Sequence, residues 1–120
     1  MHSWSETKLE KLIKKSPEKV VKYNQKQISR IYPKGSRIGS SNYDPHKAWL
    51  HGCQLVALNY QTFDNPMRFN QIKFEENNGV GYLLKPKILR DPNYSINNFS
   101  EKPTHLLKIT VSGFKILIIF

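Results

Sequence analysis

Apolar residues recur at helical spacing near the amino terminus of the chain. Leu9, Leu12 and Ile13 fall on one stripe of a helix, and the opposite side of that helix carries four lysines. Ser5, just before this pattern, has the hydroxyl of a typical N-cap, and the Ser16-Pro17 pair is a typical helix stop. The pattern therefore predicts a helix from about residue 6 to residue 15, followed by a short helical turn over residues 18–23.

Further along the chain, three short apolar runs predict β-strands, at residues 28–32, 54–60 and 82–85. The second run is continuous enough to predict a strand buried on both faces. Between the strands, residues 46–51 predict a short helix, and residues 65–78 are ambiguous with some helical character. Helices that alternate with strands favour a parallel α/β sheet. Three strands that need cover on both faces are too few to close a core, so we expect a piece of a larger fold.

The last part of the chain has a different pattern. Residues 91–103 are rich in Asn, Ser and Pro and predict a linker. Residues 105–120 then alternate between two faces, with Leu107, Ile109 and Val111 on one of them. This alternation predicts one fresh strand that begins another domain.

Charge adds a preference for phosphate. The 120 residues hold 19 Lys+Arg and 9 Asp+Glu, a formal net charge of +10. Residues 1–37 alone hold ten basic and three acidic side chains, so they carry +7 of this total. Such a surface attracts phosphate on nucleic acid, on an anionic membrane or on a small ligand, although a solvated helix face is the alternative for any single lysine.

Other classes of protein are excluded by composition. The longest apolar run, residues 116–120, is far shorter than the roughly 20 residues of a membrane span. The first residues lack the apolar centre of a signal peptide. Cys53 is the one cysteine, which suits a reducing compartment, and its place before a buried strand predicts a core position. We expect an intracellular protein with a basic surface.

Six segments then carry a resemblance to a known family. They are Ser-Trp-Ser-Glu (3–6), Lys-Tyr-Asn (22–24), Ser-Arg-Ile-Tyr-Pro-Lys-Gly (29–35), Ser-Ser-Asn-Tyr (40–43), Gly-Cys-Gln-Leu-Val-Ala-Leu-Asn-Tyr-Gln-Thr (52–62) and Asn-Gly-Val-Gly-Tyr-Leu-Leu-Lys-Pro (78–86). Together they resemble the Y-region of eukaryotic phosphoinositide-specific phospholipase C. Residues 105–120 are more weakly similar to the first strand of the C2-type lipid-binding sandwich that follows this region.

The resemblance implies a fold and a division of the chain. Residues 1–92 would form the second half of a (β/α)8 TIM barrel, incomplete without the X half. Residues 93–104 would be a linker, and residues 105–120 would supply a strand of a truncated C2-type sandwich.

The resemblance also implies an activity, a cofactor and partners. The family hydrolyses phosphatidylinositol 4,5-bisphosphate to diacylglycerol and inositol trisphosphate in intracellular lipid signalling, with a bound calcium ion. Its catalytic histidines and calcium ligands lie in the X half, and none of the four histidines here matches them. We therefore expect no catalytic or metal-binding residue in this chain, and no activity from it alone. The expected partners are a phosphoinositide substrate, an anionic membrane surface and the X half, in a cytoplasmic, peripherally membrane-associated enzyme.

Three residues match the head-group-binding set of the family, namely Ser3, Arg30 and Tyr32. A guanidinium offers phosphate oxygens a planar fork of donors, and a serine hydroxyl can bond another oxygen. The tyrosine ring can lie against the apolar face of inositol. Arg30 and Tyr32 are two residues apart, so a strand would place both on one face.

The loop after Pro33 would face the membrane in this family. Its residues Lys34 and Arg37 would attract anionic lipid. The position two past the lysine carries an apolar residue in the family and is Ser36 here.

Two other functions remain open. A catalytically inactive relative would bind phosphoinositides or protein partners without cleaving lipid, and the presence or absence of catalytic residues in the X half would decide. A small nucleic-acid-binding protein is the reading from charge alone, but the chain lacks the interleaved aromatic and basic pattern of an RNA-binding sheet.

Overall fold

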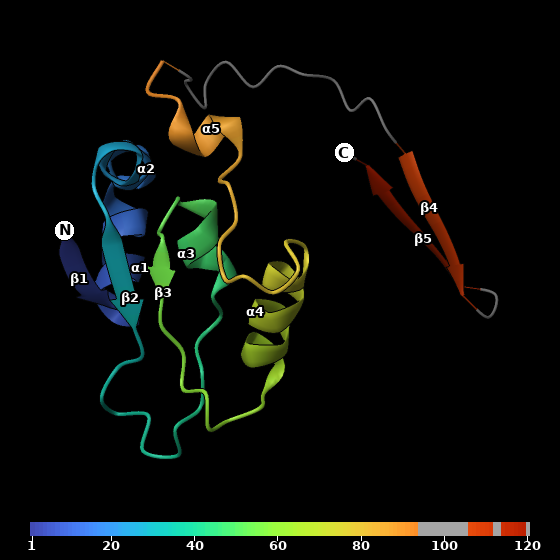
Figure 1. Cartoon of the computed structure of the whole chain (residues 1–120), viewed down its shortest axis with the longest axis horizontal. Coiled ribbons are helices and arrows are strands. Elements are labelled where there is room, and N and C mark those ends of the chain that lie inside the picture. Colours follow the sequence, from blue (N-terminus) through green and yellow to red (C-terminus); the bar gives the residue numbers. More distant parts are fainter. Residues whose placement is uncertain (94–105, 112–113, 120) are drawn as a thin grey trace.

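The structure is a computed structural model that describes residues 1–93, 106–111 and 114–119, with side chains described for residues 1–93 (Figure 1). Its elements along the chain are β1 (His2–Ser5), α1 (Glu6–Lys15), α2 (Pro17–Lys26), β2 (Ser29–Tyr32), α3 (His46–Leu50), β3 (Leu55–Val56), α4 (Asn65–Glu75), α5 (Lys87–Arg90), β4 (Leu106–Val111) and β5 (Phe114–Ile119).

The first three strands form one parallel sheet in the order β1-β2-β3. In its register Ser3 pairs with Arg30, and Arg30 pairs in turn with Leu55. Side chains of paired residues in a parallel sheet project from the same face. The expected parallel α/β architecture is confirmed.

Local sequence explains the first two helices. The Ser5 hydroxyl accepts a hydrogen bond from the backbone N–H of Lys8 at 3.3 Å, which confirms the predicted N-cap. Pro17 stands in the first turn of α2, where its missing N–H costs nothing. α2 continues to Lys26, beyond the short turn predicted, because Asn24 is only 1% exposed and anchors the last turn in the interior.

Helices α1, α2 and α3 pack on one face of the sheet. Its core consists of buried residues from α1, α2, β2, α3 and the loops beside them, namely Leu9, Val20, Ile31, Tyr43, Ala48 and Cys53. In Figure 1 α1 lies behind β1 and β2, on the side to which Ile31 projects. Cys53 is 4% exposed, so its predicted core position is confirmed, and burial raises the pKa of its thiol.

The predicted strand over residues 54–60 is wrong in length and in burial. Only Leu55–Val56 is a strand, and the Leu55 side chain is 48% exposed. Among the described residues β3 is an edge strand, and its partner β2 ends at Tyr32, before Pro33, which has no N–H to continue the pairing. A continuous apolar run therefore does not produce a strand covered on both faces.

The predicted strand over residues 82–85 is also wrong. Gly79 and Gly81 adopt positive φ angles of 71° and 78°, which turn the chain where a strand would begin. The Lys85 ammonium donates to the backbone carbonyl of Asn24 at 2.7 Å, so side-chain bonds hold this segment. Desolvation lowers the pKa of that ammonium.

Two strands were not predicted, and part of the carboxyl-terminal prediction lies outside the described residues. His-Ser-Trp-Ser of β1 has a single large apolar residue and so gives no strand pattern. The one strand predicted over residues 105–120 is an antiparallel pair, β4 with β5, in which Leu106 pairs with Ile119. Residues 94–105, most of the predicted linker, are not described.

Among the described helices, none has the length and apolar character needed to cross a bilayer.

Candidate head-group site

Ser3, Arg30 and Tyr32 lie on the face of the sheet opposite the helices. Ser3 and Arg30 are register partners on neighbouring strands, and Tyr32 follows two residues beyond Arg30 on the same face. Ser3 and Arg30 are exposed, whereas Ile31 between Arg30 and Tyr32 is fully buried. The period-two alternation of β2 places Arg30 and Tyr32 on one face, and the register with β1 adds Ser3 beside Arg30.

Arg30 and Tyr32 also contact each other. The guanidinium carbon of Arg30 lies 5.6 Å from the centroid of the Tyr32 ring, a cation–π distance. The contact with the ring keeps the guanidinium on the open face of the sheet. It does not use the N–H groups of the guanidinium, which can donate to phosphate oxygens. An exposed arginine held in this way remains able to bind an anion.

The loop that leaves Tyr32 is built from two consecutive turns. The Arg37 N–H bonds the Lys34 carbonyl at 3.1 Å, and the Ser40 N–H bonds the Arg37 carbonyl at 2.9 Å. Lys34 and Ser36 of this loop are exposed.

The Arg37 side chain is engaged within the protein. Its Nε and Nη2 donate to the two carboxylate oxygens of Glu6 at 2.5 and 2.7 Å, and its Nη1 donates to Ser41 Oγ at 3.0 Å. The hydrogen bonds from Arg37 hold the pKa of the Glu6 carboxyl below its usual value of 4.5. The sequence suggested the same lipid-binding role for Arg37 and Lys34. In the structure the Arg37 side chain is bound to Glu6, whereas Lys34 is exposed.

Two residues near the site were missed by sequence reasoning. Glu6 begins α1, where an acidic residue is ordinary, so nothing in the sequence pointed to Arg37 as its partner. Ile38 is 95% exposed in the loop. The sequence indicated this residue only by showing one apolar side chain among Gly, Ser and Arg.

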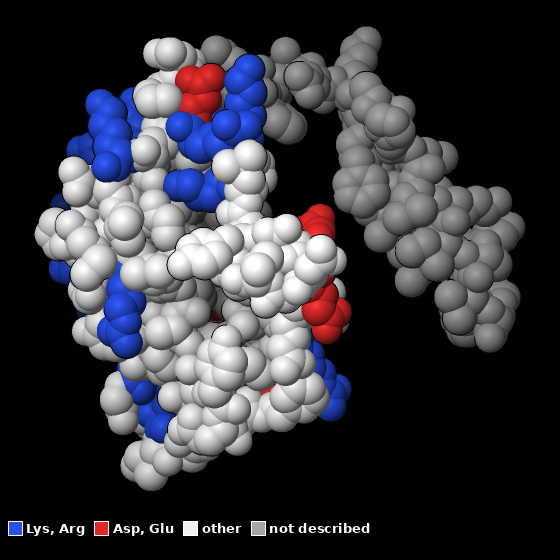
Figure 2. All heavy atoms as spheres, viewed as in Figure 1, with Lys and Arg blue, Asp and Glu red and all other residues white. Residues whose placement is uncertain are grey.

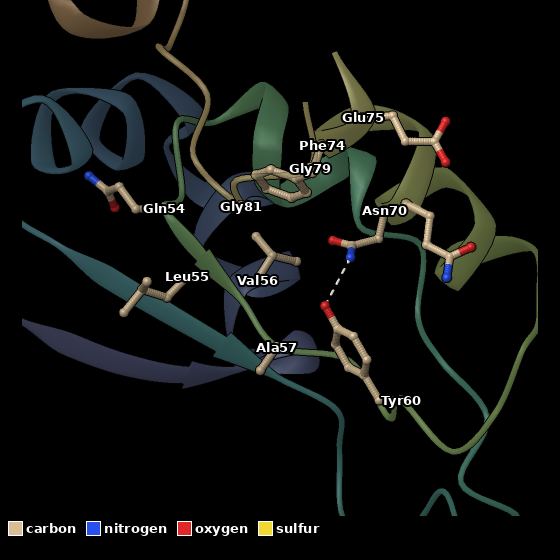
Figure 3. A pocket seen from close by; sticks show the side chains of 11 residues that line it. Gln54, Leu55, Val56, Ala57, Tyr60, Asn70, Phe74, Glu75, Gly79 and Gly81 are labelled. Carbon is tan, nitrogen blue, oxygen red and sulfur yellow. Dashed lines mark hydrogen bonds between the residues drawn. The ribbon is translucent and has the colours of Figure 1, made fainter. Parts of the chain in front are cut away.

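A hollow of about 600 Å³ lies between β3 and α4 (Figure 3). Tyr60 and Asn70 face each other across it, with the Asn70 amide donating to the Tyr60 hydroxyl at 3.3 Å. Ser3, Arg30 and Tyr32 do not line this hollow. It borders β3, and one of its lining residues, Leu55, is the register partner of Arg30.

The histidines of residues 1–93 make separate local contacts. His46 Nδ1 lies 2.7 Å from Asp44 on the surface, His51 Nδ1 contacts the Lys47 carbonyl, and His2 contacts the Tyr23 hydroxyl. Within the described part of the chain, no group of three His, Cys, Asp or Glu side chains could hold a metal ion.

Basic side chains dominate the charged surface of the described residues. Figure 2 shows the open face of the sheet, with lysine and arginine gathered along its margins and acidic side chains at few places. The lysines of α1 and α2 are exposed on the other side of the sheet from Arg30. Phosphate ligands could therefore meet two different basic surfaces.

The chain is similar to known phospholipases C. Residues 1–88 match the family described as phosphatidylinositol-specific phospholipase C, Y domain. The 1-phosphatidylinositol 4,5-bisphosphate phosphodiesterase beta-4 of Bos taurus is 57% identical over 83 residues, which are 69% of this chain and 8% of that protein. The gamma-2 phosphodiesterase of Homo sapiens is 47% identical over 111 residues, which are 92% of this chain and 9% of that protein.

Solved structures agree. The crystal structure of L. pealei PLC21 matches with a TM-score of 0.73 and 52% identity, over 75% of this chain and 12% of that one. For S. officinalis PLC21 the TM-score is 0.74 and the identity 53%, over 76% and 12% of the two chains. This chain thus spans about a tenth of the proteins it matches. The family predicted from the sequence motifs is confirmed: the chain belongs to the Y-domain family of phosphatidylinositol-specific phospholipases C.

Proposed function

We propose that this chain supplies the head-group-binding part of a phosphoinositide phospholipase C. The whole enzyme would hydrolyse phosphatidylinositol 4,5-bisphosphate to diacylglycerol and inositol trisphosphate. One observation carries the proposal: Ser3, Arg30 and Tyr32 come together on the open face of a parallel sheet, with Tyr32 at the carboxyl end of β2. Active sites of α/β barrels lie at that end of the strands.

The chemistry of the three side chains suits an inositol phosphate. The Arg30 guanidinium would bind a ring phosphate through two parallel N–H donors, and the Ser3 hydroxyl would donate to a further oxygen. Tyr32, already in contact with Arg30, would lie against the carbon face of the inositol ring. The chain would thus position the substrate, while the acid–base step would belong to the X half.

The proposed partner within the enzyme is the X half of a (β/α)8 barrel. Support comes from the edges of the sheet, because β1 and β3 are both terminal in the strand order. The exposed Leu55 and the hollow beside β3 leave apolar surface where further strands could pack. We further propose that the β4–β5 pair is the start of a C2-type domain joined by a linker over residues 93–104.

Calcium, the cofactor of the family, would be held by the X half. The described residues offer no cluster of three possible ligands, so they do not form a calcium site by themselves. We therefore expect the isolated chain to release no inositol trisphosphate, with or without calcium. The enzyme would be cytoplasmic and would meet its lipid at an anionic membrane, with the exposed Lys34 and Ser36 in the facing loop.

The test uses an enzyme with a complete barrel. The aligned 83-residue segment of the Bos taurus beta-4 phosphodiesterase is replaced by the matching residues of this chain, and Arg30→Ala is introduced. A charge-assisted hydrogen bond contributes roughly 1.5–3 kcal/mol, so kcat/KM for phosphatidylinositol 4,5-bisphosphate should fall about tenfold to a hundredfold. Hydrolysis of phosphatidylinositol, which lacks the phosphates at positions 4 and 5 of the ring, should fall much less.

Arg68 provides a matched control for this test. Its guanidinium lies 5.3 Å from the Phe63 ring centroid, a cation–π pair like that of Arg30 but on α4. Arg68→Ala in the same chimaera should leave the preference between the two lipids unchanged. Equal losses on both lipids for Arg30→Ala would show that Arg30 supports the fold instead.

A further inference from the structure

Three of the family motifs meet at a polar cluster beside the first residue of β2. Asn24 ends the motif at residues 22–24, Ser29 begins the motif at 29–35, and Gln54 belongs to the motif at 52–62. Asn24 is 1% exposed and Ser29 is 0% exposed, while Gln54 is half-buried. The proposed head-group site leaves all three residues without a role.

Gln54 uses both ends of its side-chain amide in this cluster. Its Oε1 accepts a hydrogen bond from the Ser29 backbone N–H at 3.0 Å. Its Nε2 donates to the backbone carbonyls of Asn24 at 2.8 Å and of Gln27 at 3.1 Å, where α2 ends. Because the last carbonyls of a helix have no partners within the helix, these bonds satisfy them. Gln54 thereby joins the end of α2 to the start of β2.

Asn24 completes the cluster from the side of α2. Its Oδ1 accepts from the Ser29 hydroxyl at 2.7 Å, and its Nδ2 donates to the His51 carbonyl at 2.8 Å. The Asn24 carbonyl that binds Gln54 also accepts from the Lys85 ammonium at 2.7 Å. Ser29 is therefore held through its backbone by Gln54 and through its side chain by Asn24.

Ser29 directly precedes Arg30, so the cluster acts on the backbone that carries the proposed phosphate ligand. The pairing of β2 with β3 is short, with two register partners. After Arg30, the Ile31 carbonyl accepts from the Ala57 N–H at 2.9 Å. Before Arg30, the bond from the Ser29 N–H goes to the Gln54 side chain. The backbone around Arg30 is thus held on one side by a backbone bond and on the other side by Gln54.

We propose that Gln54 is a positioning residue for phosphate recognition, because it holds Ser29 and so directs the Arg30 side chain towards a ring phosphate. The inference rests on the proposed function and deepens it, since it names a residue that sets the preference for phosphorylated inositol lipid. A rotation of the peptide before Arg30 would turn its side chain away from Ser3, its register partner. Gln54 acts through Arg30 and does not itself bind the phosphate.

The first test uses the chimaera described for Arg30→Ala. It compares kcat/KM for phosphatidylinositol 4,5-bisphosphate with kcat/KM for phosphatidylinositol. Gln54→Met keeps a side chain of similar length but removes its amide. The preference for the phosphorylated lipid should fall about three- to tenfold, the factor that one neutral hydrogen bond contributes. Met67→Ala, which removes a side chain with 1% exposure from α4, should lower stability and leave the preference unchanged.

A double-mutant cycle shows whether Gln54 acts through Arg30. Once Arg30 is replaced by alanine, the side chain that Gln54 positions is gone. Gln54→Met in the Arg30→Ala background should therefore change the lipid preference by less than about twofold, whereas independent effects would multiply the two losses. Multiplied losses would show that Gln54 affects the preference by another route, and the inference would fail.

Gln54→Glu separates positioning from stability. Glutamate keeps an oxygen that accepts from the Ser29 N–H but loses the N–H groups that bind the carbonyls of α2. The free energy of unfolding of the 120-residue chain, measured with urea, should therefore fall. The lipid preference of the chimaera should stay within about twofold of the parent. A loss of preference as large as that of Gln54→Met would contradict the role assigned to the Ser29 bond.

Two further results would overturn the inference and leave the head-group assignment intact. One is an unchanged preference in Gln54→Met when Arg30→Ala loses that preference. If Gln54→Met does not fold, Gln54→Asn, which keeps the amide but shortens its reach, takes its place with the same expected loss. The other is an equal loss of preference in Gln54→Met and Met67→Ala, which would assign Gln54 to stability alone. An unchanged preference in Arg30→Ala would instead overturn the proposed function and this inference together.

Discussion

The two faces of the small parallel sheet have different surroundings, although alternate residues of the same short strands form them. On the covered face, Trp4, Ile31 and Val56 pack into the core beneath the helices. On the open face, Ser3, Arg30 and Leu55 are exposed. Neighbouring residues of β2 therefore have different surroundings: Ile31 stabilises the core, and Arg30 is available for the proposed head-group recognition.

This difference shows how a sheet can keep polar residues available without weakening its core. Strand geometry sends alternate side chains to opposite faces, so a phosphate-binding side chain beside a buried isoleucine causes no desolvation. The face that carries the proposed function is also the face that the helices leave uncovered. Substitutions on the two faces should therefore have separable effects.

The largest expected effect is on the covered face. Ile31→Ala removes a side chain with 0% exposure and leaves a cavity in the core. The free energy of unfolding should fall by about 2–5 kcal/mol. Urea denaturation of the chain, followed by circular dichroism, measures this change, and a loss below 1 kcal/mol would mean that the covered face is not the stabilising one.

A smaller effect is expected at the boundary between the faces, where Glu6 of α1 binds Arg37. Glu6→Gln at neutral pH should lower the free energy of unfolding by about 1.5–3 kcal/mol, the contribution of hydrogen bonds to a charged group. The pair is only slightly exposed, so solvent screens it little.

The effect of Glu6→Gln should also depend on pH in a definite direction. Because the pKa of Glu6 is lowered by folding, its stabilisation is complete above about 4.5 and is lost as the pH falls through the lower folded value. Urea denaturation of parent and variant between pH 7 and pH 3 should therefore give free energies of unfolding that become similar at the acid end of the range. A difference that stays constant over this range would exclude the ionised Glu6 as its source.

The smallest expected effect on stability is on the open face. Arg30→Ala removes an exposed side chain whose described contact is the Tyr32 ring, so the free energy of unfolding should change by no more than about 0.5 kcal/mol. The same urea experiment checks it against Ile31→Ala. A large loss at Arg30 would remove the distinction between the faces.

Sequence patterns predicted the features that depend on local chemistry. The cap at Ser5, the break at Ser16-Pro17, the strand ending at Tyr32 and the buried Cys53 all follow from residue type and spacing. The family motifs indicated Ser3, Arg30 and Tyr32 as head-group residues, which stays a prediction, and strand periodicity explains why Arg30 and Tyr32 share a face.

Features that depend on contacts between distant parts of the chain could not be predicted from residue type and spacing. The Leu-Val-Ala-Leu run is apolar enough for a long strand, yet pairing ends at Val56 because the partner strand β2 ends at Tyr32, before Pro33. The role of Arg37 depended on Glu6, 31 residues away. The exposure of Ile38 depended on a loop shape that Glu6 helps to fix.

The most direct test of the account is a nuclear magnetic resonance titration of the labelled chain with inositol 1,4,5-trisphosphate. This ligand is strongly anionic, so it could bind the open face or the lysines of α1 and α2. The account predicts that the largest shifts fall at Ser3, Arg30 and Tyr32, and that Arg30→Ala removes them. Shifts confined to the lysine-bearing helices, or unchanged by Arg30→Ala, would contradict the assignment of the open face as the head-group site.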